Sequence, residues 1–267
     1  MIPDAYITAW RAVAPWASDQ QVEHDLVLTR ALLQLFSTSY LRDRFLLRGG
    51  TALNKLHIAE PVRYSEDIDL VQLAQEPIGG SLDRIHEILD PWLGEPDYDQ
   101  KHRSITLKYD YEAENTGRTQ RLKVEINTRE HFAIESVQER ELSVDNPWFS
   151  GQEKIPTFTL NELMGTKLRA LYQRNKGRDL FDLWFVHNNR DISPERVCEL
   201  FLEYMQHQGL DISGNVYEDN MLEKKKDRHF RNDVKQLLRP GVTYDVEEAF
   251  AILLNEYVPH LPAKRHF

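Results

Sequence analysis

The stretch Arg48–Leu70, RGGTALNKLHIAEPVRYSEDIDL, decides how this chain folds and what chemistry it can carry. Gly49 and Gly50 precede Thr51 and an apolar run that is compatible with a helix. Paired glycines at a helix start let backbone N–H groups approach a ligand closely, and the positive end of the helix favours an anion such as phosphate. We therefore expect a phosphate-binding turn, followed by a helix that ends before Pro61 because proline lacks an N–H.

The same stretch ends in two acids, Asp67 and Asp69, which a single apolar residue separates. In a β-strand these acids lie on one face, whereas Ile68 and Leu70 lie on the other. Two adjacent carboxylates repel each other unless a cation lies between them, and Mg²⁺ is the usual cation near phosphates. A Gly-Gly pair or a D-x-D motif alone is common in ordinary turns, but the two in this order favour a site of nucleotidyl transfer.

The amino-acid composition is that of a globular protein and excludes several other classes of protein. The 267 residues can form one large domain or two smaller ones, and 41% hydrophobic and 28% charged residues are typical of a globular protein. The single cysteine, Cys198, excludes an internal disulfide and fits a reducing cytosol. We see no signal peptide and no apolar run as long as a membrane span, so we expect a cytoplasmic protein without a membrane partner. The net charge of −10 argues against nonspecific coating of nucleic acid, but a local basic patch stays possible.

A third acid follows on an alternating segment, residues 120–127, in which Leu122, Val124 and Ile126 face one way and Glu125 faces the other. Acids on neighbouring strands can converge on one metal site, so Glu125 is a candidate partner of the acid pair. The alternative is an ordinary strand residue that faces solvent. The acid pair upstream makes us favour the site.

The sequence of the second part of the chain predicts helices. Residues 128–156 look irregular, and we expect a domain boundary near Ser150. The first domain, residues 1–150, would contain N-terminal helices and the catalytic core, and the second, residues 151–267, would be mainly helical. A capping box at Thr159–Glu162 is expected to start its first helix.

Positive charge is dense in that helix and in the turn after it. Lys167 and Arg174 lie two turns apart on one predicted helix face, where they could form a cationic wall for a triphosphate or pyrophosphate. The alternative is a solvated face on which Arg178 pairs with Asp179 or Asp182. Asp182 lies in a largely apolar helix, and a buried acid needs a partner there. It could orient Lys167 or Arg174, or contact the nucleotide.

Two further basic segments are ambiguous. Residues 224–239 are rich in lysine and arginine, and the tail Lys264–His266 is also basic. Each segment is as compatible with a solvated surface as with an RNA contact.

Together these motifs resemble the AbiEii/AbiGii-type nucleotidyltransferases, which are the toxins of type IV toxin–antitoxin and abortive-infection systems. The resemblance covers about residues 46–185 and is carried by four segments: Gly49–Leu53, Arg63–Asp69, Val124–Ile126 and Lys167–Leu183. In the second motif position Gly50 stands where many members of the wider superfamily have serine.

The resemblance implies an α+β fold with a DNA-polymerase-β-like core, in which helices flank a mixed sheet, and a mainly helical C-terminal domain. It implies that Asp67 and Asp69 hold two Mg²⁺ ions and that Glu125 shares the ion that activates the attacking hydroxyl. Lys167 would neutralise the triphosphate, and Asp182 would belong to the catalytic set. The residues expected to bind the nucleotide are Gly49, Gly50, Thr51, Ser65, Lys167 and Arg174, although the Ser65 hydroxyl could instead cap a turn.

We therefore expect a Mg²⁺-dependent nucleotidyltransferase toxin that transfers NMP from an NTP to an RNA 3′ end, with tRNA as the acceptor and inhibition of translation and growth as the result. Its expected partner is a separately encoded antitoxin. Two alternatives stay open: the same chemistry on a small molecule or a protein hydroxyl, and a nucleotide-binding regulator without turnover. The sequence disfavours a P-loop enzyme because it has no G-x-x-x-x-G-K-[ST] motif.

Overall fold

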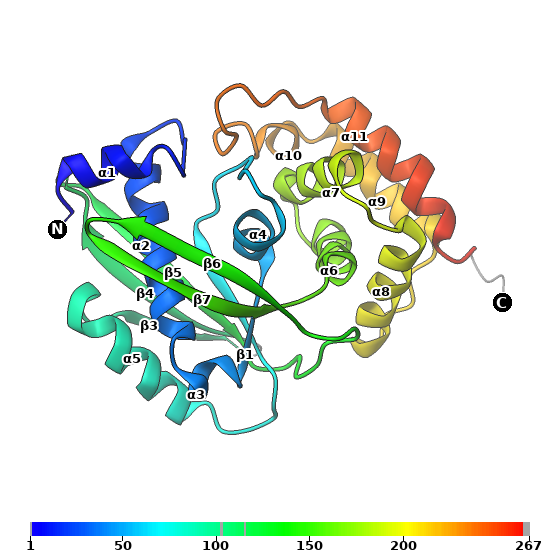
Figure 1. Cartoon of the computed structure of the whole chain (residues 1–267). Helices are drawn as coiled ribbons and strands as arrows, with labels where there is room; N and C mark the ends of the chain where they lie inside the picture. Colours follow the sequence, from blue (N-terminus) through cyan, green and yellow to red (C-terminus); the bar gives the residue numbers. More distant parts are fainter. Residues whose placement is uncertain (1, 102–103, 115, 264–267) are drawn as a thin grey trace. The chain divides into compact units, whose positions relative to one another are not determined.

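The computed structural model describes residues 2–101, 104–114 and 116–263, which form two compact units (Figure 1). The first unit contains residues 1–158 and 237–240, and the second contains residues 159–236 and 241–267. Ser150, near which we expected the boundary, lies inside a strand of the first unit. The basic tail Lys264–His266 lies outside the described residues.

A seven-stranded mixed sheet forms the centre of the first unit, with the strand order β3-β4-β5-β2-β1-β7-β6. The pairs β2–β5 and β1–β7 are parallel, and the remaining pairs are antiparallel. This architecture confirms the predicted α+β class with a mixed sheet. The strands are β1 (Phe45–Arg48), β2 (Asp67–Gln72), β3 (Asp97–Lys101), β4 (Ser104–Glu112), β5 (Thr119–Asn127), β6 (Gln138–Asn146) and β7 (Phe149–Thr157).

Helix α2 (Asp19–Phe36) is the longest helix of the first unit and packs against strands β2, β5, β6 and β7. A capping box starts this helix, because Gln21 N donates to the Ser18 hydroxyl and the Gln21 side chain accepts from Ser18 N. Its apolar stripe, which includes Val22, Leu26 and Leu33, is buried. The other helical segments of this unit are α1 (Asp4–Trp10), α3 (Ser39–Arg42), α4 (Gly49–Ala52), the π-helical turn η1 (Leu53–His57) and α5 (Gly79–Leu93).

The prediction that residues 128–156 are irregular is wrong, because this region contains the hairpin β6–β7. The hairpin joins the sheet where β7 pairs in parallel with β1, at Leu47 and Thr157. Half of the residues of the two strands are exposed, and in β6 the alternation of buried and exposed residues is confined to its second half, which contains Leu142 and Val144. A strand that buries so few apolar side chains leaves only a weak period-2 pattern in the sequence.

All named elements of the second unit are helices. Thr159 caps α6, since its hydroxyl accepts from Glu162 N, and α6 packs against α7 and α8. Within the described residues, no helix combines the length and the apolar character needed to cross a membrane. The helices are α6 (Leu160–Gln173), α7 (Gly177–Asn189), α8 (Pro194–His207), α9 (Gly214–Lys226), α10 (Arg228–Asn232) and α11 (Val246–Ile252), followed by the turns η2 (Leu253–Tyr257) and η3 (Val258–His260).

A short segment, Leu237–Pro240, belongs to the first unit although it follows α10 in sequence. Its backbone pairs with the residues that precede β2: Tyr64 N donates to Leu237 O (2.7 Å), and Arg239 N donates to Val62 O (3.0 Å). The approach to the acid-bearing strand is therefore completed by residues far along the chain.

Candidate active site

The glycine turn begins where β1 ends, and it brings the backbone into contact with the acid pair. Gly49 has φ +78°, in the left-handed region that favours glycine. A Cβ atom on Gly49 would lie 2.1 Å from Oδ2 of Asp69, a distance that no pair of non-bonded heavy atoms tolerates. Only glycine therefore fits between the turn and the Asp69 carboxylate.

The next two residues of the turn are enclosed. A Cβ on Gly50 would lie 2.6 Å from Nη2 of Arg63 and 2.8 Å from the Ser65 hydroxyl. Thr51 is fully buried, and its hydroxyl donates to Asp67 O (2.6 Å) and lies 2.9 Å from Ser65 Oγ. The structure thus gives no support to a phosphate contact by the Thr51 hydroxyl, which instead ties the turn to the acid strand. A serine at position 50 would require the Arg63 guanidinium or the Ser65 hydroxyl to move.

Sheet register brings the three predicted acids onto one face. In the parallel pair β2–β5, Asp69 lies opposite Glu125 and Asp67 lies opposite Lys123. The alternation holds in β2, where Asp67 and Asp69 are half-buried while Ile68 is fully buried. We call Asp67, Asp69 and Glu125 the acid face.

The acid face carries unfavourable charge. Burial raises the pKa of Asp67 to about 6, helped by the negative charges of Asp69, Glu66 and Glu125. Lys123 opposes this rise, because its Nζ lies 3.6 Å from Oδ1 of Asp67. A carboxyl group with a pKa raised in this way is typical of a site that binds a cation.

The acid face fits a metal that arrives with phosphates better than a metal bound by protein alone. Among residues 2–101, 104–114 and 116–263, no group of three or more histidine, cysteine, aspartate or glutamate side chains is arranged to hold an ion by itself. Mg²⁺ is ordinarily bound through one or two carboxylates, with substrate phosphates and waters as the other ligands. Asp67 and Asp69, on one strand face beside the glycine turn, match that donor set.

The predicted cationic residues of the second unit form a buried ion cluster. Lys167 is 4% exposed, and its Nζ lies 3.1 Å from Asp179 Oδ1 and 2.9 Å from Asp182 Oδ2. Arg174 donates to both oxygens of Asp179, at 2.7 and 2.9 Å, with about half of its side chain exposed. Burial alone would raise the pKa of Asp179, but Lys167 and Arg174 outweigh it and lower the pKa to about 2.

The contacts of this cluster can be compared with those expected from the sequence. Arg178 Nε donates to Asp233 at 3.0 Å. The expected link between Asp182 and Lys167 is present. Since Lys167 is buried between two carboxylates, Arg174 is the more exposed cation of the cluster.

Two residues of the candidate site, Lys123 and Asp179, were not predicted from the sequence. Lys123 lies on the same strand face as Glu125, so the alternation of β5 could have identified it as a neighbour of the acids. Asp179 was considered only as an ion-pair partner of Arg178. No pattern in the sequence indicates that its carboxylate is the centre of the cluster with Lys167 and Arg174, because that contact depends on how α6 and α7 pack.

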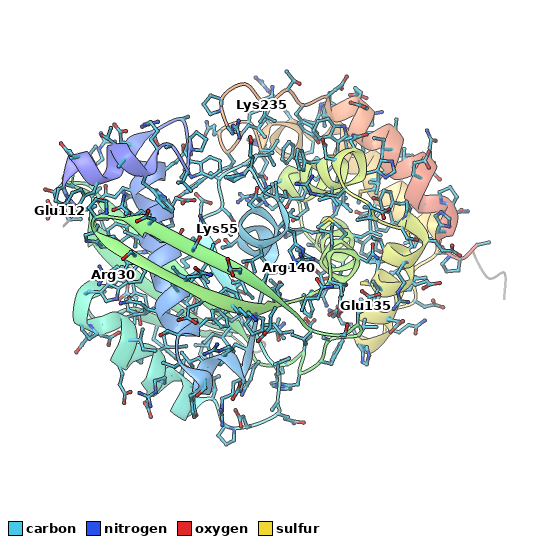
Figure 2. All side chains as sticks on the ribbon, viewed as in Figure 1. Arg30, Lys55, Glu112, Glu135, Arg140 and Lys235 are labelled. Atoms are coloured by element: carbon cyan, nitrogen blue, oxygen red, sulfur yellow. The ribbon has the colours of Figure 1, made fainter. Side chains whose placement is uncertain are left out.

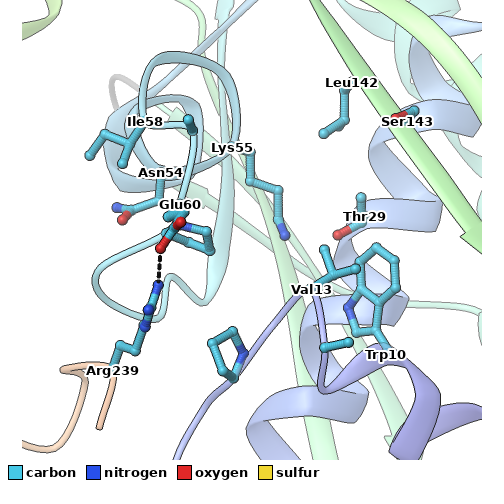
Figure 3. Close-up of a pocket in the computed structure, with 14 residues that line it drawn as sticks. Trp10, Val13, Thr29, Asn54, Lys55, Ile58, Glu60, Leu142, Ser143 and Arg239 are labelled. Carbon is cyan, nitrogen blue, oxygen red and sulfur yellow. Dashed lines mark hydrogen bonds and ion pairs between the residues drawn. The ribbon is translucent and has the colours of Figure 1, made fainter. Parts of the chain in front are cut away.

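A hollow of about 510 Å³ lies beside η1, bordered by residues of α1, α2 and β6 (Figure 3). Lys55 extends into it from η1, as Figures 2 and 3 show, and binds Asp25 at 2.8 and 2.9 Å. Arg239 at its edge binds Glu60 at 2.9 Å. Lys55 and Arg239 are thus each neutralised by an acid. No residue of the acid face lines this hollow.

Comparison with known proteins identifies the family. The family described as "Nucleotidyl transferase AbiEii toxin, Type IV TA system" matches residues 30–255, most of the chain. The chain belongs to this family. It is therefore a nucleotidyltransferase of the toxin type, as the motifs predicted. A search of curated proteins gave no match.

Solved structures resemble this AbiEii protein over nearly its whole length. MenT4, a nucleotidyltransferase toxin from Mycobacterium tuberculosis, has a TM-score of 0.63 and 18% sequence identity, and the similarity covers 98% of this chain and 91% of MenT4. JHP933 from Helicobacter pylori has a TM-score of 0.53 and 18% identity, with 91% of each chain covered. At these identities the likeness establishes the fold, a mixed sheet flanked by helices.

Proposed function

We propose that this AbiEii protein transfers a nucleoside monophosphate from an NTP to the 3′ hydroxyl of an RNA, with tRNA as the acceptor and Mg²⁺ as the metal. The observation that carries the proposal is the acid face beside the glycine turn. Asp69 touches the turn and lies opposite Glu125, while burial and neighbouring charge raise the pKa of Asp67 to about 6.

In the proposed site, Asp67 and Asp69 would hold the metal, and Glu125 would share in holding it. Bound divalent ions would polarise the phosphates and favour loss of the hydroxyl proton. The backbone at Gly49 and Gly50 is proposed to hold the β- and γ-phosphates, since the Thr51 hydroxyl is already engaged within the protein. Ser65 then supports the turn through its contact with Thr51 rather than binding the nucleotide directly.

The proposed reaction is an in-line displacement at the α-phosphorus. A bond forms between the acceptor 3′ oxygen and phosphorus, the bond to the β-phosphate bridging oxygen breaks, and pyrophosphate leaves. The acceptor's hydroxyl proton passes to the carboxylates of the acid face.

The ion cluster of the second unit has a supporting role in this proposal. Arg174 supplies charge to the triphosphate because its side chain is half exposed. Lys167 and Asp182 act as positioning residues that fix Asp179 and thereby Arg174. As the toxin of a type IV system, the chain is proposed to have a separately encoded antitoxin, and an RNA acceptor would place its activity in the cytoplasm.

The test incubates the full chain with Mg²⁺, each α-³²P-labelled NTP in turn and total tRNA, followed by a denaturing gel. Asp69→Asn preserves side-chain volume and removes charge from the acid face. Asp110→Asn is the matched control, since Asp110 lies on strand β4 of the same sheet and binds Arg121 at the surface.

Label on the tRNA band that disappears with Asp69→Asn and persists with Asp110→Asn supports the proposal and names the nucleotide. Pyrophosphate release without labelled RNA would move the acceptor to a small molecule or a protein hydroxyl. Equal labelling by wild type and Asp69→Asn would refute the acid face as the catalytic centre.

A further inference from the structure

A polar hollow of about 650 Å³ lies within the second unit, between the turn that joins α6 to α7 and helix α10. The α6–α7 turn contributes Asn175 and Lys176. The other lining residues come from α10 and the segment after it: Arg228, His229, Asn232, Asp233 and Gln236. All but Asp233 are exposed, so the hollow opens to solvent.

The lining is rich in hydrogen-bond donors. Every lining side chain except Asp233 can carry at least one N–H donor, and no apolar side chain lines the hollow. Side-chain amides and cations are the groups that contact the phosphates of nucleic acids. A hollow with these walls suits an anion with several acceptor oxygens.

Charge in and around the hollow favours the same ligand. Asp233 is held by Arg178 at 3.0 Å and lies 3.7 Å from Lys176, so two cations surround this acid. In the part of the chain that the structure describes, Arg228 and His229 form no side-chain ion pair. Asp227, a neighbouring acid, caps α10 and contacts the Asn175 amide.

The local balance is therefore positive in a chain whose net charge is −10. The residues in and beside the hollow include three cations, Lys176, Arg178 and Arg228, and two carboxylates, Asp227 and Asp233, so the positive charges exceed the negative charges by one. Lys235, labelled in Figure 2 on the segment after α10, lies close by in sequence and adds another exposed cation. Local basic patches steer polyanions even to an acidic protein.

We propose that this hollow binds the phosphodiester backbone of the acceptor RNA, and this inference rests on the proposed function. A phosphodiester backbone fits better than the triphosphate of the NTP for two reasons. No pair of carboxylates lines the hollow to hold the cation that accompanies a triphosphate. The donors are side chains on an open surface rather than the backbone of an enclosed glycine turn, which suits a polymer that passes along it.

Each cation that contacts an RNA phosphate releases a counterion, so its removal changes the salt dependence of binding as well as the affinity. Arg228→Gln keeps a polar, exposed side chain and removes one charge from the hollow. Arg196→Gln is the matched control, because Arg196 is a cation of α8 that binds Glu199 at 2.7 Å and does not line the hollow.

The experiment measures the affinity of labelled total tRNA for the full chain by filter binding at several salt concentrations. All proteins carry Asp69→Asn, so that binding is read without transfer. Arg228→Gln should weaken binding about tenfold at low salt, as expected when one charged hydrogen bond is lost, and reduce the slope of log affinity against log salt by about 0.7–0.9. Arg196→Gln should leave both quantities unchanged, and thermal melting should show that each variant is folded.

Unchanged affinity and slope for Arg228→Gln would overturn the proposal. A raised KM for NTP in the catalytically active Arg228→Gln protein, with unchanged tRNA affinity, would also overturn it, since the hollow would then hold the nucleotide. The two proposals can fail separately. If wild type transfers no nucleotide to tRNA but Asp69→Asn binds tRNA through Arg228, transfer to tRNA fails and the binding site stands. If transfer occurs and Arg228→Gln binds as the control does, the binding site fails and the function stands.

Discussion

Gly49→Ala should lower the rate of transfer about 100-fold and the free energy of unfolding by about 1–2 kcal/mol. The new Cβ would lie 2.1 Å from Asp69 Oδ2, whereas real Cβ atoms essentially never come closer than 3.0 Å to such an atom. The Asp69 carboxylate or the turn must therefore move by about 1 Å, and a misplacement of about 1 Å at a reacting centre can lower the rate about 100-fold. An L-residue in the left-handed region also costs about 1–2 kcal/mol of stability.

The backbone cost can be separated from the clash. Gly209 also has a positive φ, +72°, but a Cβ there meets nothing within 4 Å. Gly209→Ala should thus lower the free energy of unfolding by about 1–2 kcal/mol without loss of activity. Transfer of α-³²P label measures activity, and urea unfolding measures stability. If Gly49→Ala kept more than half of the wild-type rate, the contact between the turn and Asp69 would not govern the chemistry.

Three further predictions test other parts of the site. Burial and nearby acids raise the pKa of Asp67 from 3.8 to about 6, so its ionisation destabilises the metal-free fold at pH values above about 6. Asp67→Asn should therefore raise Tm at about pH 8, and this gain should vanish as the pH falls from about 6 to about 4. A gain that did not change with pH would contradict this. Lys167→Met should lower the free energy of unfolding by about 3–5 kcal/mol, because it removes the buried cation that lies between Asp179 and Asp182, whereas the half-exposed Arg174→Gln should cost about 1 kcal/mol. Equal losses in urea unfolding would argue against the buried cluster. Gly50→Ser should cost about 1–3 kcal/mol, since its Cβ would press on the buried Arg63 guanidinium, and an unchanged Tm would show that this space can open.

The sequence predicted the parts of the site that lie within single strands. The alternation in β2 placed Asp67 and Asp69 on one face, and the alternation in β5 placed Glu125 opposite to its apolar neighbours. These predictions hold because side chains in a strand alternate whatever the strand pairs with. The register that sets Asp69 beside Glu125 is a long-range property, and only the structure reveals it.

Features that depend on packing could not be read from the sequence. The hairpin β6–β7 was missed because it buries few apolar side chains. The Thr51 hydroxyl was expected to face phosphate, but the fold of residues 63–67 turns Ser65 and the Asp67 carbonyl towards it. Lys167 was expected to meet substrate, yet two acids of α7 neutralise it, and one of them, Asp179, was not singled out.

The return of Leu237–Pro240 to the first unit bears on how the enzyme is made. A nascent chain that has reached Phe158 contains every strand of the sheet, but Tyr64 N and Val62 O still lack the partners that Leu237 and Arg239 supply. The segment that leads into the acid strand is therefore completed only after the helices α6–α10 have been synthesised. In a chain built in this order, the backbone that leads to Asp67 and Asp69 receives its last hydrogen-bond partners late in translation.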